Sequence, residues 1–148
     1  MIKKIRYLVE AVFIYTFFGI SKIIGLSLSR KLFSFIFKMV GPVIRSNKIP
    51  LKNLDIFSKN ISISEKKKII SSMWSNYGKT FIEYVFLNKL RNNNSHIEVL
   101  GIDILDDIQK ENKPVIFISG HFANFELMSM EITKKKINLA TIYRPLNN

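Results

Sequence analysis

Cysteine is absent from the 148 residues of this chain. Its absence excludes a disulfide framework, a thiolate nucleophile and a thiolate metal site, and it fits a reducing compartment. Histidine is also scarce, because His96 and His121 are the two in the chain and they lie far apart in sequence. We therefore expect neither a metal site nor a bound cofactor.

Acidic residues are the second scarcity. The chain has 23 Lys and Arg against 11 Asp and Glu, a formal net charge of +12. Such a balance implies an anionic partner, either lipid or nucleic acid. Between Glu10 and Asp55 there is no acidic residue at all, while seven basic ones fall there: Lys22, Arg30, Lys31, Lys38, Arg45, Lys48 and Lys52.

The acid-free region is also rich in phenylalanine, with "AVFIYTFFGI" and "LFSFIFKMVGPVI". Basic residues near an anionic membrane surface contribute about 1 kcal/mol each. A spanning helix needs about 20 apolar residues, and the longest uncharged run here, residues 11–21, is too short alone. We predict a membrane-associated helical segment over residues 1–44, either monotopic or spanning. Nucleic-acid binding is not expected, because no motif supports it and the basic stretch is too hydrophobic.

The remaining residues predict an α/β domain. The helix of residues 1–44 is expected to break near Gly41 and Pro42, and a polar connector follows over residues 45–60. Ser62 and Glu65 have capping-box spacing and predict the start of a long helix. Strands are expected at 97–101, 113–119 and 137–144, alternating with helices at 102–112 and 122–134. This order predicts a mixed, largely parallel sheet with flanking helices.

The stretch "PVIFISGHFANFELM" carries the candidate chemistry. Its first part predicts a buried strand, so His121 would lie at the carboxyl end of that strand, where open α/β sheets bind ligands. Residues five apart on a helix differ by about 140° in rotation, so His121 and Glu126 meet only if His121 folds back from a preceding turn. The carboxylate would then accept one imidazole N–H and leave the other nitrogen as a base for a substrate hydroxyl. The alternative is that His121 is a hydrogen-bonded helix cap.

The string "SGHFANFELM" resembles the "GHxGNWE"-like motif of the bacterial lipid A biosynthesis acyltransferases, the late acyltransferases of the lauroyl and myristoyl type. A second block, "TIYRPLNN", resembles the family's "YRPxxN" motif. Two departures are mild: Ala123 stands where glycine is usual, and Phe125 where tryptophan is common. The resemblance covers most of the chain and corresponds to roughly the N-terminal half of a full-length member.

This resemblance implies an enzyme of the bacterial inner membrane whose active site faces the cytoplasm. Such enzymes transfer a fatty acyl chain from acyl carrier protein, or sometimes from coenzyme A, to a hydroxyl of an anionic glycolipid, the lipid A precursor. His121 matches the motif's general base and Glu126 its acidic partner. Arg144 would pair with a phosphate or a developing oxyanion. Asn124 and Gly120 match positions that shape the turn and the substrate site.

Residues 45–148 would then be the N-terminal part of an α/β acyltransferase domain whose C-terminal half is absent. Two alternatives remain at this point: an inactive membrane-bound fragment, and an enzyme of the same family with another glycolipid or phospholipid acceptor. Glu83 also matches an acidic position of the family, but it lies on a polar helical stripe. An exposed or paired carboxylate is therefore expected there.

Overall fold

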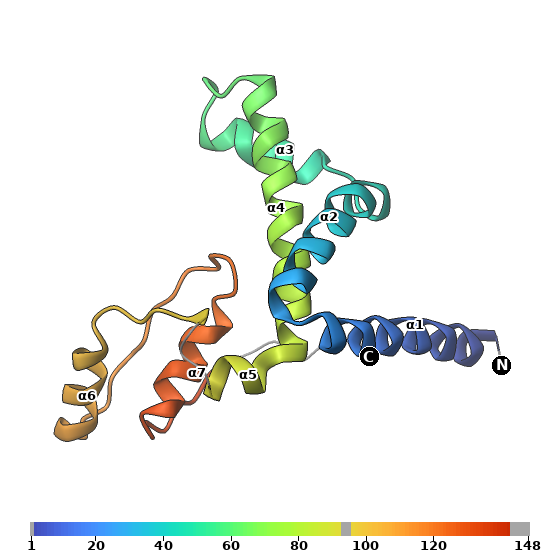
Figure 1. The fold of residues 1–148 in the computed structure, drawn as a ribbon. Coiled ribbons are helices and arrows are strands. Elements are labelled where there is room, and N and C mark those ends of the chain that lie inside the picture. Colours follow the sequence, from blue (N-terminus) through green and yellow to red (C-terminus); the bar gives the residue numbers. More distant parts are fainter. Residues whose placement is uncertain (1, 93–95, 143–148) are drawn as a thin grey trace. The chain divides into compact units, whose positions relative to one another are not determined.

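The computed structural model describes residues 2–92 and 96–142 (Figure 1). The chain folds as two compact units, Met1–Leu87 and Asn88–Asn148. In chain order the elements are α1 (Ile2–Ile24), α2 (Leu26–Ile44), α3 (Lys48–Phe57), α4 (Ile63–Glu83), the 3₁₀ helix η1 (Tyr84–Phe86), α5 (Leu87–Asn92), α6 (Ile102–Glu111) and α7 (Glu126–Lys134). The expected division into a membrane segment 1–44 and a domain 45–148 stays a prediction.

The N-terminal helical region breaks at Gly25, between α1 and α2. Gly25 has φ 81°, a left-handed conformation that glycine adopts without steric cost. The break expected at Gly41 and Pro42 is wrong, since α2 continues through both residues. Gly41 serves packing instead, because a Cβ there would lie 2.3 Å from Cε3 of Trp74.

Helix α2 packs closely on α4, and this contact is the centre of the first unit. Small residues allow the approach: a Cβ on Gly78 would lie 2.2 Å from the carbonyl oxygen of Phe33, and the hydroxyls of Ser34 and Ser75 are 2.6 Å apart. The rings of Phe33 and Phe81 stack beside them with centroids 5.9 Å apart. The two helices therefore meet through backbone and small side chains, flanked by aromatic rings.

The capping box predicted at the start of α4 is confirmed. The backbone N–H of Glu65 donates to Ser62 Oγ at 3.2 Å, and that of Ser62 donates to Glu65 Oε2 at 2.9 Å. The connector expected at residues 45–60 contains a helix that the sequence pattern did not predict, α3. Its start is tied to α4 by the indole N–H of Trp74, which donates to Asn47 Oδ1 at 2.9 Å.

The predicted α/β fold with a parallel sheet is wrong, because no strand occurs within residues 2–92 and 96–142. The β-branched run at residues 113–119 has no regular secondary structure, and Ile116 and Ile118 are 88% and 90% exposed. Extended residues become strands only where a neighbouring segment accepts their ladder hydrogen bonds. Here residues 112–117 and 136–142 instead flank a cavity of about 750 Å³.

Helix α1 is the one helix in the described part of the chain that is long and apolar enough to cross a membrane, judged by length and composition over Lys3–Ile24. A signal sequence near an N-terminus passes the same test, as does the buried core helix of a soluble protein. Only 6% of its apolar window is buried. Most of its apolar side chains are therefore exposed, although Phe17 and Phe18 contact Phe33 and Phe81.

Candidate functional site

His121 lies in a tight turn before α7, outside the helix. The backbone N–H of Phe122 donates to the carbonyl oxygen of Gly120 at 2.8 Å, which makes His121 the central residue of a three-residue γ-turn. His121 has no positive φ, so the turn is of the common inverse type. As predicted, His121 lies in a turn outside the helix, but the helix begins at Glu126 and not at Phe122. The buried strand expected before His121 is wrong, because residues 113–119 form no strand.

The imidazole of His121 lies against the ring of Phe125. Their centroids are 4.2 Å apart and the two planes are tilted by 53°. Phe125 is the N-cap residue of α7 and makes no side-chain capping hydrogen bond, so its ring is available to restrict the imidazole. The sequence pattern gave Phe125 no role. Its role could have been predicted from the motif, because tryptophan is common at this position and phenylalanine is aromatic too.

Two small residues set the backbone path around His121. A Cβ on Gly120 would lie 2.4 Å from Cε2 of Phe122, so glycine lets that ring fold over the backbone. Ala123 has φ 45°, in the left-handed region that favours glycine. This explains why glycine is usual at that position of the motif and shows that Ala123 carries local strain here.

Glu126 is the first residue of α7, and a carboxylate in a helix's first turn is favoured by the macrodipole. The carbonyl oxygen of Asn124 accepts from the N–H of Leu127 at 3.2 Å, which joins the turn to the helix. One short segment, residues 120–126, therefore holds Gly120, His121, Asn124 and Glu126. Hydrogen bonding of His121 to Glu126 stays a prediction, and Arg144 lies outside the described residues.

Helix α7 also lines an apolar cavity of about 480 Å³ in the second unit. Leu127, Met128 and Ile132 of α7 face it together with Leu105 and Ile108 of α6.

The three lysines at residues 134–136, at the end of α7, are partly neutralised. Lys134 Nζ lies 2.6 Å from Glu131 Oε1, and Lys135 pairs with Asp106. Within residues 2–92 and 96–142, no group of three or more His, Asp or Glu could hold a metal ion.

Comparison with protein families gives one decisive result. Residues 2–148 match the model of the family described as bacterial lipid A biosynthesis acyltransferase. The chain belongs to this family. Searches of curated proteins and of solved structures find no match.

Membership of the acyltransferase family confirms the resemblance carried by "SGHFANFELM". It indicates acyltransferase activity in lipid A biosynthesis, and hence an acyl donor and a lipid acceptor as the kinds of substrate. It also indicates membrane association, with which the exposed apolar helix α1 agrees.

Proposed function

We propose that this acyltransferase moves a fatty acyl chain from acyl carrier protein to a hydroxyl of a lipid A precursor. The observation that carries the proposal is the place of His121, at the centre of a turn five residues before α7, in a chain of this family. A base in a turn is accessible to a substrate hydroxyl, and its side chain is exposed here. No covalent intermediate on the enzyme is needed.

In the proposed reaction the free imidazole nitrogen of His121 takes the proton of the acceptor hydroxyl as its oxygen attacks the thioester carbonyl. The tetrahedral oxyanion then collapses, the C–S bond breaks, and the departing thiolate takes the proton back from the imidazolium. An ester and a free thiol result. Glu126 would accept the second imidazole N–H and stabilise the imidazolium, which fixes the tautomer that can act as a base.

Three further residues are proposed to bind the substrate. Arg144 would hold a phosphate of the acceptor or the oxyanion by charge-assisted hydrogen bonds. Gly120 and Asn124 would keep the backbone of the turn close to the reacting groups. The start of α7 adds a positive helix end beside the turn, where negative charge is favoured.

We also infer an inner-membrane location with the catalytic turn on the cytoplasmic side. The first unit carries almost all of the net charge: residues 1–87 hold 15 Lys and Arg against 4 Asp and Glu, or +11, while residues 88–148 hold 8 against 7, or +1. A basic unit with an exposed apolar helix suits an anionic membrane surface. The chain should stay in the membrane pellet through a high-salt wash and leave it only in detergent; release by salt alone would contradict an embedded α1.

The chemistry is tested by transfer of a labelled acyl chain from acyl carrier protein to a lipid A precursor in detergent. His121→Ala should lower the rate by roughly 10²- to 10⁴-fold, the usual contribution of a general base. His96→Ala is the matched control, because His96 is the other histidine and is also exposed; its rate should not change. Normal turnover by a folded His121→Ala chain would refute the assignment, and no turnover by the unaltered chain would favour the inactive alternative.

A further inference from the structure

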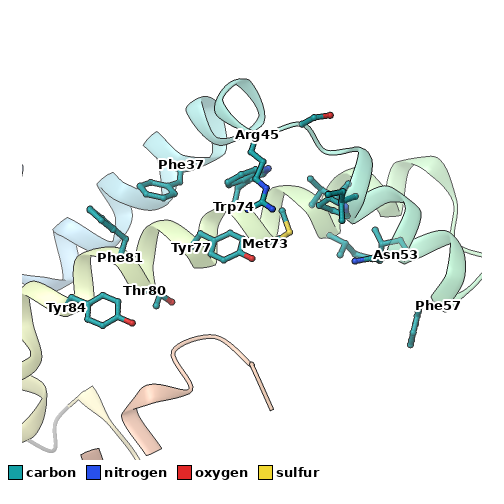
Figure 2. Close-up of a pocket in the computed structure, with 16 residues that line it drawn as sticks. Phe37, Arg45, Asn53, Phe57, Met73, Trp74, Tyr77, Thr80, Phe81 and Tyr84 are labelled. Carbon is teal, nitrogen blue, oxygen red and sulfur yellow. The ribbon is translucent and has the colours of Figure 1, made fainter. Parts of the chain in front are cut away.

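The first unit contains an apolar groove that the acyl-transfer proposal does not use. It lies between α2, α3 and α4 and encloses about 850 Å³, within the range of small-molecule sites. Figure 2 shows its labelled side chains spread along α4, with Phe37 on α2 and Asn53 and Phe57 on α3. Phe37, Leu54, Met73, Trp74, Tyr77 and Phe81 form much of its wall.

The groove has a single formal charge. Of the 16 lining residues, Arg45 is the only charged one and none is acidic. Arg45 follows α2 as its C-cap, and its side chain is exposed. Among the described residues it has no ion pair, whereas Arg6 and Arg30 each have a glutamate partner. The groove therefore presents a long apolar wall and one uncompensated guanidinium.

The chemistry of this groove selects an anionic amphiphile. A guanidinium binds a phosphate by two parallel N–H···O bonds, and aliphatic chains gain free energy by leaving water for an apolar wall. The surrounding unit carries +11 over residues 1–87, so its field attracts anions and not cations. Tyr77 and Trp74 pair an apolar ring with a polar tip, as side chains at membrane interfaces do.

We propose that this groove binds an anionic phospholipid of the bilayer, with one acyl chain along the aromatic wall and the phosphate on Arg45. The site belongs to the first unit, whereas His121 belongs to the second. The proposal is therefore independent of the acyl-transfer reaction and survives if that reaction is refuted. It assigns to the helical unit a specific lipid contact in addition to a general attraction to the membrane.

Trp74 provides a direct measurement, because it is the only tryptophan in the chain. Its indole is held at the groove by the hydrogen bond to Asn47. The full chain is placed in detergent micelles and titrated with phosphatidylglycerol that carries bromine on its acyl chains, a contact quencher of indole fluorescence. Brominated phosphatidylcholine, with the same chains and a zwitterionic head, is the comparison. The anionic lipid should quench Trp74 at a markedly lower mole fraction than the zwitterionic one.

Two pairs of variants, each a test and its control, examine the contact with the phosphate and the contact with the acyl chain. Arg45→Gln should raise the half-quenching concentration of the anionic lipid about tenfold, the loss of one charge-assisted contact, and should abolish the preference over phosphatidylcholine. Lys48→Gln, which removes an equal charge outside the groove lining, should leave the half-quenching concentration and the preference for the anionic lipid unchanged. Ile49→Glu places a carboxylate at the groove on α3 and should prevent quenching, while Ile56→Glu on the same helix, outside the lining, should not.

The alternative occupants give different results. Equal quenching by both lipids would show general immersion in the micelle and overturn the site. Quenching by neither would show that protein covers the groove and would overturn it as well. Far-UV circular dichroism checks that each variant keeps its helices; both Ile49 and Ile56 are more than half exposed, so one of the two tests remains if Arg45→Gln unfolds the unit.

Discussion

The guanidinium of Arg30 and the carboxylate of Glu83 meet between α2 and α4, with Nε and Oε1 2.7 Å apart. Glu83 is buried, with 7% of its surface exposed, and the side chain of Arg30 is 28% exposed. Of the two expectations for Glu83, the paired carboxylate is confirmed. The pair ties together two helices through residues that are 53 positions apart in sequence, and it stands at the end of α4 that leads into η1.

Arg30→Ala should destabilise the first unit by about 2–3 kcal/mol. Removing one partner of a buried pair costs about 3–5 kcal/mol, and the partial exposure of Arg30 reduces this. The measurement is urea unfolding in detergent, followed by circular dichroism. Arg6→Ala is the matched control, because its ion pair with Glu10 is exposed on both sides and should contribute at most about 0.5 kcal/mol. Equal losses in the two variants would contradict a structural role for the Arg30–Glu83 pair.

Gly78→Ala should separate α2 from α4. The added Cβ would lie 2.2 Å from the carbonyl oxygen of Phe33, a backbone atom that cannot rotate away. Overpacking of this kind costs about 1–3 kcal/mol. Gly19→Ala in α1 is the control, since its Cβ meets nothing within 4 Å and alanine favours helix by up to about 1 kcal/mol. The same unfolding experiment should therefore give shifts of opposite sign.

The capping box predicts that the stability of the start of α4 depends on pH. The hydroxyl of Ser62 donates to the carboxylate of Glu65, and with the Ser62 backbone N–H it lowers the pKa of Glu65 below its ordinary value of 4.5. A carboxyl with a lowered folded pKa contributes stability that is present above the unfolded pKa and is lost as pH falls through the folded one. In Ser62→Ala, an NMR titration should find the Glu65 pKa nearer its ordinary value; an unchanged pKa would contradict the hydrogen bond.

Local signals in the sequence predicted local structure well. Ser62 and Glu65 marked the start of α4 because both halves of a capping box lie within four residues. The helix predicted at residues 102–112 is found as α6, which spans Ile102–Glu111 and has Asp103 in its first turn. The turn at His121 was also expected from its neighbours, although the helix that follows begins later than predicted, at Glu126.

Features that depend on distant partners were not predictable in this way. The run at residues 113–119 has strand-like residues, but a strand needs a hydrogen-bonded neighbour, and composition cannot show whether one is present. Helix α3 was missed because Pro50 and the polar residues around it were read as a connector, and the contact of Trp74 with Asn47 cannot be seen in the sequence. The partner of Glu83 was hidden for the same reason.

Ala123→Gly should stabilise the turn that holds His121. A left-handed conformation costs a residue with a Cβ about 1–2 kcal/mol, and Ala123 has φ 45°. Part of the gain is offset by the greater freedom of glycine in the unfolded chain, so a net gain of up to about 1 kcal/mol is expected. Ala140→Gly is the control, because Ala140 has no positive φ and should lose stability. A loss in both variants would show that Ala123 is not strained.

Phe125 is predicted to position the imidazole of His121 during acyl transfer. The ring centroids lie 4.2 Å apart, and an aromatic pair contributes about 0.5–1.5 kcal/mol. If this contact holds the base in its reactive orientation, Phe125→Ala should lower kcat by roughly 2- to 10-fold, with little change in KM for the acyl donor. Phe125→Trp should retain near-normal kcat, because an indole offers the same face and is common in the family at this position.

The same kinetics separate positioning from a structural role. Phe125 caps α7 without a side-chain hydrogen bond and is 36% exposed, so its removal should leave the helix intact by circular dichroism. A merely structural role predicts that Phe125→Ala loses activity and helicity together, and that tryptophan, which is larger, does no better than alanine. Loss of kcat in a folded Phe125→Ala chain, with rescue by tryptophan, would support a ring that acts through His121, whose imidazole it contacts.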